Sequence, residues 1–135
     1  MTETLLLDSN ALIALFDGDR GVARAMASAA RIVIPAVVCG EIDAGTQGDT
    51  AREREEREAF AELLALPTVA VAPVTRTTGA FYARVFRYAQ SIGRPIPTND
   101  IGIAAATLET AGLLCTDDRH LLSLPLIRTT GFRSR

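Results

Sequence analysis

The sequence contains no lysine and no tryptophan, and it has one histidine and two cysteines. All 14 basic residues are therefore arginines, which excludes a lysine Schiff base and phosphate binding through a lysine. The single histidine, His120, cannot make a metal cluster alone, and we expect it to have a packing or surface role. Cys39 and Cys115 lie far apart in apolar stretches, so we expect small buried side chains, not a zinc site or a redox motif.

The sequence also lacks long apolar runs. None approaches the roughly 20 residues that a membrane-spanning helix needs, and the first four residues carry an acid and no base, unlike a secretory signal. We therefore expect a cytoplasmic protein that does not contact a membrane. A length of 135 residues with 48% apolar content predicts one domain, residues 1–135, with a proper core.

The net charge of −2 does not by itself indicate a nucleic-acid-binding protein. If several acids gather in one site, however, the rest of the surface is more basic than this total implies. Arginine is also the better bidentate ligand for phosphate groups.

Short apolar runs alternate with helical segments along the chain. Strands are predicted at 5–7, 32–34, 69–71, 113–115 and 126–128, and helices at 9–16, 20–30, 36–44, 52–66, 75–92, 100–111 and 119–124. We expect Gly45 and Gly112 to end two of these helices. Strands separated by helices predict an α/β fold with a parallel sheet.

Four acids occupy positions that are unusual when taken together. Asp8 and Asp118 each follow a short apolar run, which predicts a buried strand before each acid. Asp100 begins a helix that is apolar on most sides, so we expect it to be partly desolvated. Glu41 flanks the apolar face of its helix. Each acid alone is explained as well by helix capping or by the helix dipole.

Their combination favours a metal site. In a parallel sheet the strand ends converge on one edge, where such folds bind ligands. Carboxylates that meet there repel one another unless a divalent cation neutralises them. Oxygen ligands suit Mg²⁺ or Mn²⁺, so the leading hypothesis is a metal-dependent phosphodiesterase. Polar residues beside the acids are expected to orient bound water or to hold the carboxylates; they are Ser9, Asn10, Thr98, Asn99 and Thr116.

Two other functions are open. The first is an aspartyl-phosphate phosphatase or receiver domain with Asp8 as the nucleophile. Phosphatases of that type place a second aspartate two residues later, where this chain has Asn10, and both classes use a lysine, which this chain lacks. The second is a scaffold that binds but does not catalyse.

The same residues resemble a known family, the PIN-domain ribonucleases. The segments that carry this resemblance are Leu6-Leu7-Asp8-Ser9-Asn10-Ala11-Leu12-Ile13, Glu41-Ile42-Asp43-Ala44-Gly45, Ile96-Pro97-Thr98-Asn99-Asp100-Ile101-Gly102-Ile103-Ala104-Ala105 and Thr116-Asp117-Asp118-Arg119-His120-Leu121. They follow the family's order over nearly the whole chain. Leu121 stands where the family often has phenylalanine, which we interpret as a packing change. The chain length and the Pro-Thr-Asn-Asp segment look like the VapC toxins of toxin–antitoxin pairs.

This resemblance implies a three-layer α/β/α sandwich with a central, mainly parallel sheet. It implies a toxin that is a divalent-metal-dependent endoribonuclease, with Mg²⁺ or Mn²⁺ as the cofactor, and a cognate antitoxin that inhibits it. By the same resemblance Asp8 and Asp100 would be the main metal ligands, and Glu41 and Asp118 would complete the acidic set. A homodimer is also implied, and the helix at 75–92 offers an apolar stripe for it, formed by Phe81, Tyr82, Val85 and Phe86.

Overall fold

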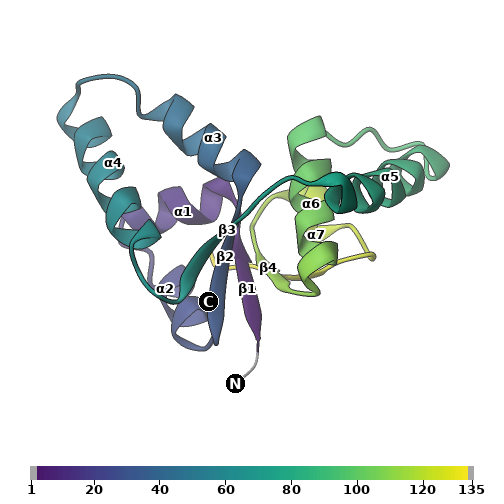
Figure 1. Ribbon diagram of the computed structural model, residues 1–135, viewed down its shortest axis with the longest axis horizontal. Helices are drawn as coiled ribbons and strands as arrows, with labels where there is room; N and C mark the ends of the chain where they lie inside the picture. The colour runs from purple at the N-terminus through teal and green to yellow at the C-terminus, as the bar shows by residue number, and fades with distance from the viewer. Residues whose placement is uncertain (1–2, 134–135) are drawn as a thin grey trace.

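The computed structural model describes residues 3–133, which form a five-stranded parallel sheet covered by helices (Figure 1). The strands are β1 (Thr4–Leu7), β2 (Arg31–Pro35), β3 (Val69–Ala72), β4 (Leu113–Cys115) and β5 (Arg128–Thr130). The helices are α1 (Ser9–Phe16), α2 (Arg20–Ala27), α3 (Ala36–Gly45), α4 (Ala51–Leu64), α5 (Arg76–Ser91), α6 (Thr98–Thr110) and α7 (Arg119–Leu122).

The strand order is β3-β2-β1-β4-β5, and all four neighbouring pairs are parallel. Figure 1 shows α1 to α4 on one side of the sheet and α5 to α7 on the other. The predicted α/β/α sandwich is therefore confirmed. Since the strands are parallel, their carboxyl ends all lie along one edge of the sheet.

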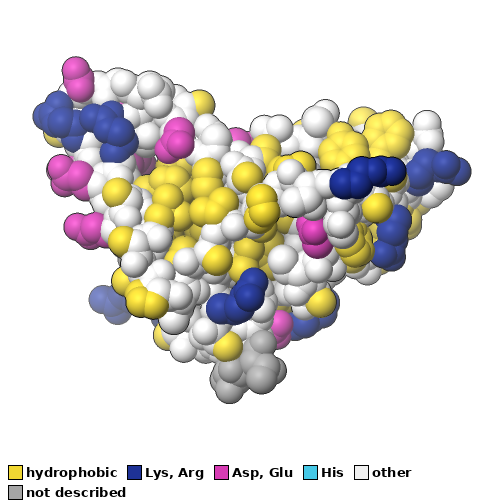
Figure 2. All heavy atoms as spheres, viewed as in Figure 1, with side chains coloured by type: hydrophobic (Ala, Val, Ile, Leu, Met, Phe, Trp, Pro, Cys, Tyr) yellow, Lys and Arg dark blue, Asp and Glu magenta, His cyan; other side chains and the backbone are white. Residues whose placement is uncertain are grey.

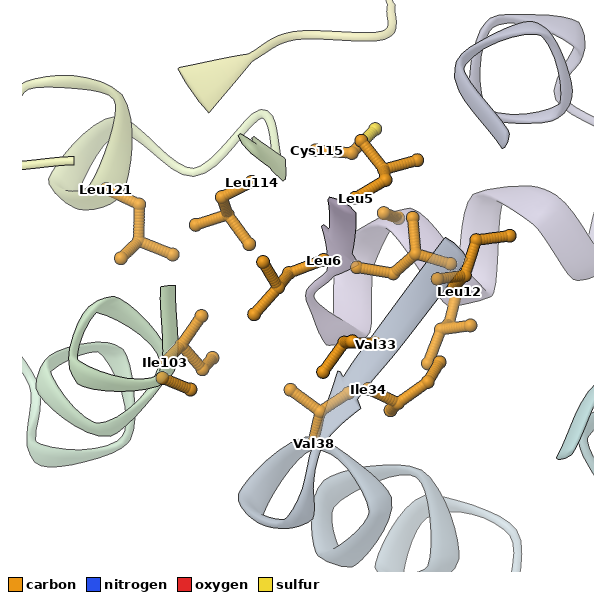
Figure 3. Packing of buried hydrophobic residues seen from close by; sticks show 14 of the residues in the cluster. Leu5, Leu6, Leu12, Val33, Ile34, Val38, Ile103, Leu114, Cys115 and Leu121 are labelled. Carbon is orange, nitrogen blue, oxygen red and sulfur yellow. The ribbon is translucent and has the colours of Figure 1, made fainter. Parts of the chain in front are cut away.

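The central strand β1 is the most buried part of the sheet. Leu5, Leu6 and Leu7 are each no more than 1% exposed. A parallel strand covered on both faces carries apolar side chains at every position, which explains three consecutive leucines. Figure 3 shows Leu5 and Leu6 packed among side chains from β2, β4, α1, α3 and α6. Complete burial of each leucine contributes about 1.5–3 kcal/mol relative to an exposed one.

Several helices begin at a polar residue whose side chain accepts a hydrogen bond from the first turn. The Ala11 N–H donates to the Asp8 carboxylate at the start of α1, and the Val22 N–H donates to the Asp19 carboxylate at the start of α2. Thr50 forms a capping box with the third residue of α4. Four predicted helix boundaries are wrong by two or more residues. Helix α6 begins at 98 instead of 100, and three helices end early: α2 at Ala27 instead of Ala30, α4 at Leu64 instead of Leu66, and α7 at Leu122 instead of Leu124.

The end of α6 also differs from the predicted glycine cap. Ala111, not Gly112, has the left-handed backbone conformation, with φ of 53°. Gly112 is buried, and a Cβ at this position would lie 2.9 Å from the carbonyl oxygen of Thr4 and would overlap the side chain of Leu6. Gly112 is therefore needed for the close approach of the chain to β1.

The last strand lies two residues later than predicted, at 128–130 instead of 126–128. The apolar residues that suggested the earlier position are buried without being in a strand. Leu124 is 3% exposed and Ile127 is 8% exposed, and both lie in the loop that leads into β5. The apolar pattern marked contacts with the core and not the backbone conformation.

The charged helix α4 lies on the outside of the molecule, where Figure 2 shows arginine and acidic side chains gathered. Arg52 pairs with Asp17 at 3.0 Å and with Glu56 at 3.8 Å. Arg57 donates to backbone carbonyls of the loop before α4. Exposed pairs of this kind add at most about 1 kcal/mol. Among residues 3–133, no helix is long and apolar enough to cross a membrane.

Replacement of Gly112 by alanine should destabilise the fold by about 1–3 kcal/mol, because the new Cβ must displace backbone of β1. Gly79→Ala is the matched control. Gly79 lies in α5, and no neighbouring atom comes within 4 Å of the place that a Cβ would take, so alanine there should stabilise by about 0.5–1 kcal/mol. Urea unfolding measures both, and equal effects of the two substitutions would contradict this packing argument.

Candidate active site

The site lies where the order of the strands reverses. From β1 the chain proceeds to β2 on one side, whereas β4 and β5 lie on the other side of β1. Open α/β sheets bind ligands outside the carboxyl ends of the strands at such a switch point. Asp8 follows β1 directly, and Thr116 follows β4 directly. Because Leu7 pairs with Cys115, the next residues, Asp8 and Thr116, lie side by side.

Asp8 is held from two directions. Its Oδ1 accepts the Ala11 N–H at 2.8 Å, and its Oδ2 accepts the hydroxyl of Thr116. The residue is only 3% exposed. Burial raises the pKa of the Asp8 carboxyl above its ordinary value, and the negative charges of Asp118 and Glu41 raise it further. The hydrogen bonds from Thr116 and Ala11 oppose this shift.

Thr116 joins Asp8 to Asp118. The Thr116 side chain is completely buried, and its Oγ1 accepts the Asp118 N–H at 3.0 Å while donating to Asp8. The Asp118 carboxylate begins α7 by accepting the N–H groups of His120 at 2.8 Å and Leu121 at 3.3 Å. Helix capping and a place in the acidic group are therefore compatible for both Asp8 and Asp118.

Glu41 is tied to two other helices. It lies in the second turn of α3, and its Oε1 accepts the Ser9 hydroxyl of α1 at 2.5 Å. Its Oε2 accepts the Asn99 Nδ2 of α6 at 3.2 Å. Ser9 and Asn99 thus fix the direction of this carboxylate. Asn10 is exposed and lies outside this network, lining a separate polar hollow with Asp17 and Arg133 among others.

Asp100 lies in the first turn of α6, directly after Asn99. The pKa of the Asp100 carboxyl is raised from 3.8 to about 6, mainly by partial burial and further by the charges of Asp118, Glu41 and Asp8. His120 opposes this increase. The four predicted acids are therefore close enough to interact electrostatically.

Sequence reasoning gave His120 a packing or surface role, and the structure places it near Asp100. Its side chain is exposed, and its positive form would lower the pKa of the Asp100 carboxyl. The spacing of His120 two residues after Asp118 was the signal available in the sequence, because it places His120 in the short helix that Asp118 begins.

The donor set suits a hard divalent cation, since its carboxylate, hydroxyl and amide groups offer oxygen ligands. As the side chains stand, no three of the histidine, cysteine and acidic residues within 3–133 are placed to hold one ion. Mg²⁺ commonly uses only one or two carboxylates and keeps several waters. Each carboxylate accepts about four hydrogen bonds or metal contacts, so Asp8 and Glu41 keep free acceptor positions beside those in use. The residues therefore fit such an ion in their chemistry.

The sequence profile of the PIN domain matches residues 5–125. The chain belongs to the PIN domain family. No protein with a curated description has significant sequence similarity to the chain. The aspartyl-phosphate alternative loses its support, since the match places the chain in another family.

Solved structures confirm the PIN fold. A chain of VapBC2 from Rickettsia felis, bound to a fragment of promoter DNA, has a TM-score of 0.83 at 14% identity, over 96% of this chain and 98% of that one. A chain of DNA-bound VapBC from Salmonella typhimurium has a TM-score of 0.80 at 17% identity, over 98% and 99%. VapBC-5 from Mycobacterium tuberculosis gives 0.73 at 24% identity, over 96% and 98%.

The raised pKa of Asp100 predicts how the stability of this PIN domain depends on pH. Between pH 3.8 and about 6 the native state keeps a proton that the unfolded chain has released, so stability falls as pH rises through this range. Asp100→Asn removes this loss. In EDTA, the stability of Asp100→Asn relative to wild type should therefore increase from pH 4 to pH 6 and then level off.

Urea unfolding across this pH range measures the difference. Glu58→Gln is the control, because Glu58 is an exposed acid of α4 and is not among the groups that shift the pKa of Asp100. Its effect should be the same at both ends of the range. A pH-independent difference for Asp100→Asn would contradict the raised pKa of Asp100.

Proposed function

We propose that this PIN domain is a divalent-metal-dependent endoribonuclease and the toxin of a toxin–antitoxin pair. The observation that carries the proposal is the electrostatic coupling of Asp8, Glu41, Asp100 and Asp118 at the switch point of the sheet. Partly buried carboxylates that repel one another destabilise the fold, and a cation bound between them would remove this repulsion. The PIN assignment supports nuclease chemistry for such a group.

The proposed reaction is hydrolysis of an RNA phosphodiester. Water adds to phosphorus, the bond from phosphorus to one ribose oxygen breaks, and that oxygen takes a proton. A bound Mg²⁺ or Mn²⁺ would supply a water of lowered pKa and would offset the charge that develops on the phosphate. Asp8 and Asp100 are the proposed main ligands, and Glu41 and Asp118 complete the set. Supporting roles fall to Ser9, Asn10, Asn99 and Thr116, of which Ser9, Asn99 and Thr116 already hold acids in place.

An antitoxin is the proposed protein partner. Several similar structures are of VapBC or FitAB pairs, which supports an assembly of this kind. An apolar hollow of about 360 Å³ between α1 and α4 offers a surface for such a partner, lined by residues that include Leu15, Phe16 and Leu66. Figure 2 shows apolar side chains gathered between α4 and the sheet. The cytoplasm, where RNA and antitoxin would both be met, is the proposed location.

A homodimer through α5 is the proposed oligomeric state, with one change from the predicted stripe. Val85 is completely buried within the chain and so cannot contact a second copy. Phe81 and Tyr82 are half-buried, whereas Phe86 is 46% exposed. Phe86 is therefore the residue of α5 best placed to contact a partner. The charged helix α4 is proposed to contact that partner as well.

The nuclease assignment predicts that purified wild-type protein cuts single-stranded RNA with Mn²⁺ and stops in EDTA. Asp100→Ala should lower kcat/KM by about 100-fold or more, because a direct ligand should matter at least as much as an outer one. Expression of wild type without antitoxin should arrest bacterial growth, and Asp100→Ala should relieve the arrest.

Asp43→Ala is the matched control, since Asp43 is an exposed acid on the same helix as Glu41. It should cut RNA as wild type does. Mn²⁺ should also raise the melting temperature of wild type and Asp43→Ala but not of Asp100→Ala. A folded Asp100→Ala that cuts like wild type would overturn the assignment, and a wild type that binds the antitoxin without cutting RNA would favour the non-catalytic scaffold.

The dimer proposal predicts that Phe86→Glu gives a monomer, because a charge would be buried at the centre of the contact. Leu122→Glu is the control, since Leu122 is similarly exposed, at 42%, but lies on α7. Light scattering at micromolar concentration distinguishes the two states. A monomeric wild type, or dimers in both variants, would exclude this contact.

A further inference from the structure

A cavity of about 270 Å³ lies beside the acidic group, at the carboxyl ends of β2 and β3. Its walls come from the start of α3, the segment after β3, and the facing sides of α5 and α6. In Figure 1 the segment from β3 to α5 crosses between α3 and α6. Pro35, Val37, Pro73 and Tyr82 form much of the apolar wall.

The cavity is continuous with the acidic group through Asn99. Asn99 lines the cavity, and its Nδ2 donates to Glu41 at 3.2 Å. The next residue along α6 is Asp100. An occupant of the cavity would therefore lie next to any phosphodiester held by the four acids.

The residues that line the cavity suit a flat, uncharged ligand. None of the lining residues, all within the described part of the chain, is acidic or basic, so the cavity does not suit a phosphate. Apolar walls with a few polar groups are typical of sites for small ring systems. The polar residues of the lining are Thr78, Tyr82, Thr98 and Asn99, and the Thr78 hydroxyl is already used in a 2.7 Å hydrogen bond to Glu109. Tyr82, Thr98 and Asn99 are the other polar residues of the lining, and they can form hydrogen bonds with the edge of a ring.

The size agrees with one nucleobase. A cavity of about 150 Å³ accepts benzene, so about 270 Å³ accommodates a larger ring with its bound polar edge. The volume is near the lower end for ligand pockets, which argues against a helix or loop of another protein. Single-stranded RNA is commonly recognised through bases that leave the stack and enter pockets with aromatic walls.

We propose that this cavity binds the base of a nucleotide next to the cleaved phosphate and thereby sets the sequence preference of cleavage. This inference rests on the proposed nuclease function. It assigns specificity to Tyr82, Thr98 and the small residues Gly79 and Gly102, which keep the cavity open, while the acids carry out the chemistry.

Gly79→Leu is the variant that tests the cavity. Gly79 lies within α5 and lines the cavity, and a Cβ added there would meet no neighbouring atom within 4 Å. Leucine is a better helix former than glycine, so the variant should fold at least as well as wild type. Gly45→Leu is the matched control, because Gly45 is also helical, exposed and open around the place of a Cβ but does not line the cavity.

The assay cuts single-stranded RNA with randomised positions and identifies the bases on both sides of each cut. Wild type and Gly45→Leu should share a preference at one flanking position. Gly79→Leu should reduce that preference at least tenfold and raise KM more than it lowers kcat. An oligonucleotide without a base at the preferred position should be cut poorly by wild type, and no worse by Gly79→Leu than by wild type.

An unchanged preference in Gly79→Leu, or no preference in wild type, would overturn the base pocket while leaving the nuclease assignment intact. A change of oligomeric state in Gly79→Leu alone would assign the cavity to a contact between two copies and would also overturn it. If wild type cuts no RNA, the nuclease assignment fails, and binding of the four nucleoside monophosphates, measured by NMR, decides the cavity separately. Binding to wild type and Gly45→Leu but not to Gly79→Leu supports the pocket, and any other pattern overturns it.

Discussion

The hydrogen bond from Thr116 to Asp8 is the contact on which the site depends. It joins the ends of β1 and β4, the two strands between which the order of the sheet reverses. Asp8 is nearly inaccessible to water, so its carboxylate is costly to bury without partners. Thr116 supplies one partner and the first turn of α1 supplies the other. The same threonine fixes the backbone of Asp118, so one hydroxyl positions two acids.

The helices add a second set of ties around Glu41. Ser9 donates from α1 and Asn99 donates from α6, so a carboxylate on α3 is held by helices on both faces of the sheet. A buried or half-buried charge is stable only where such donors surround it. At Asp8, where Thr116 and the Ala11 N–H are the donors, the pKa is still raised, so the donors offset only part of the cost of burial. A ligand that binds only the native state and lowers this repulsion stabilises the fold by mass action.

Much of the site follows from sequence because Asp8 and Thr116 are placed by strand ends. A run of leucines before each of them predicts a buried parallel strand, and parallel strands must end on one edge. The hydrogen bonds of Glu41 do not follow, since they depend on how α1, α3 and α6 pack. The proximity of the exposed His120 to Asp100 does not follow either, because Asp100 lies on another helix. The position of β5 was missed because an apolar pattern reports burial more reliably than backbone conformation. The left-handed turn at Ala111 was missed because glycine is the usual residue for such a turn, whereas Gly112 is needed for close packing against β1.

Two adjacent environments of opposite character share the carboxyl edge of the sheet. Around Asp8 and Asp100 the chain gathers negative charge, whereas a few residues away its walls are neutral and largely apolar. Asn99 belongs to both, with its amide directed to Glu41 and its position on the cavity wall. Such a division separates the binding of a phosphate, which needs a cation, from the binding of a base, which needs shape and a few hydrogen bonds. Substitutions on the neutral side can therefore change which sequence is bound without changing the charged groups, because the two sides have only Asn99 in common.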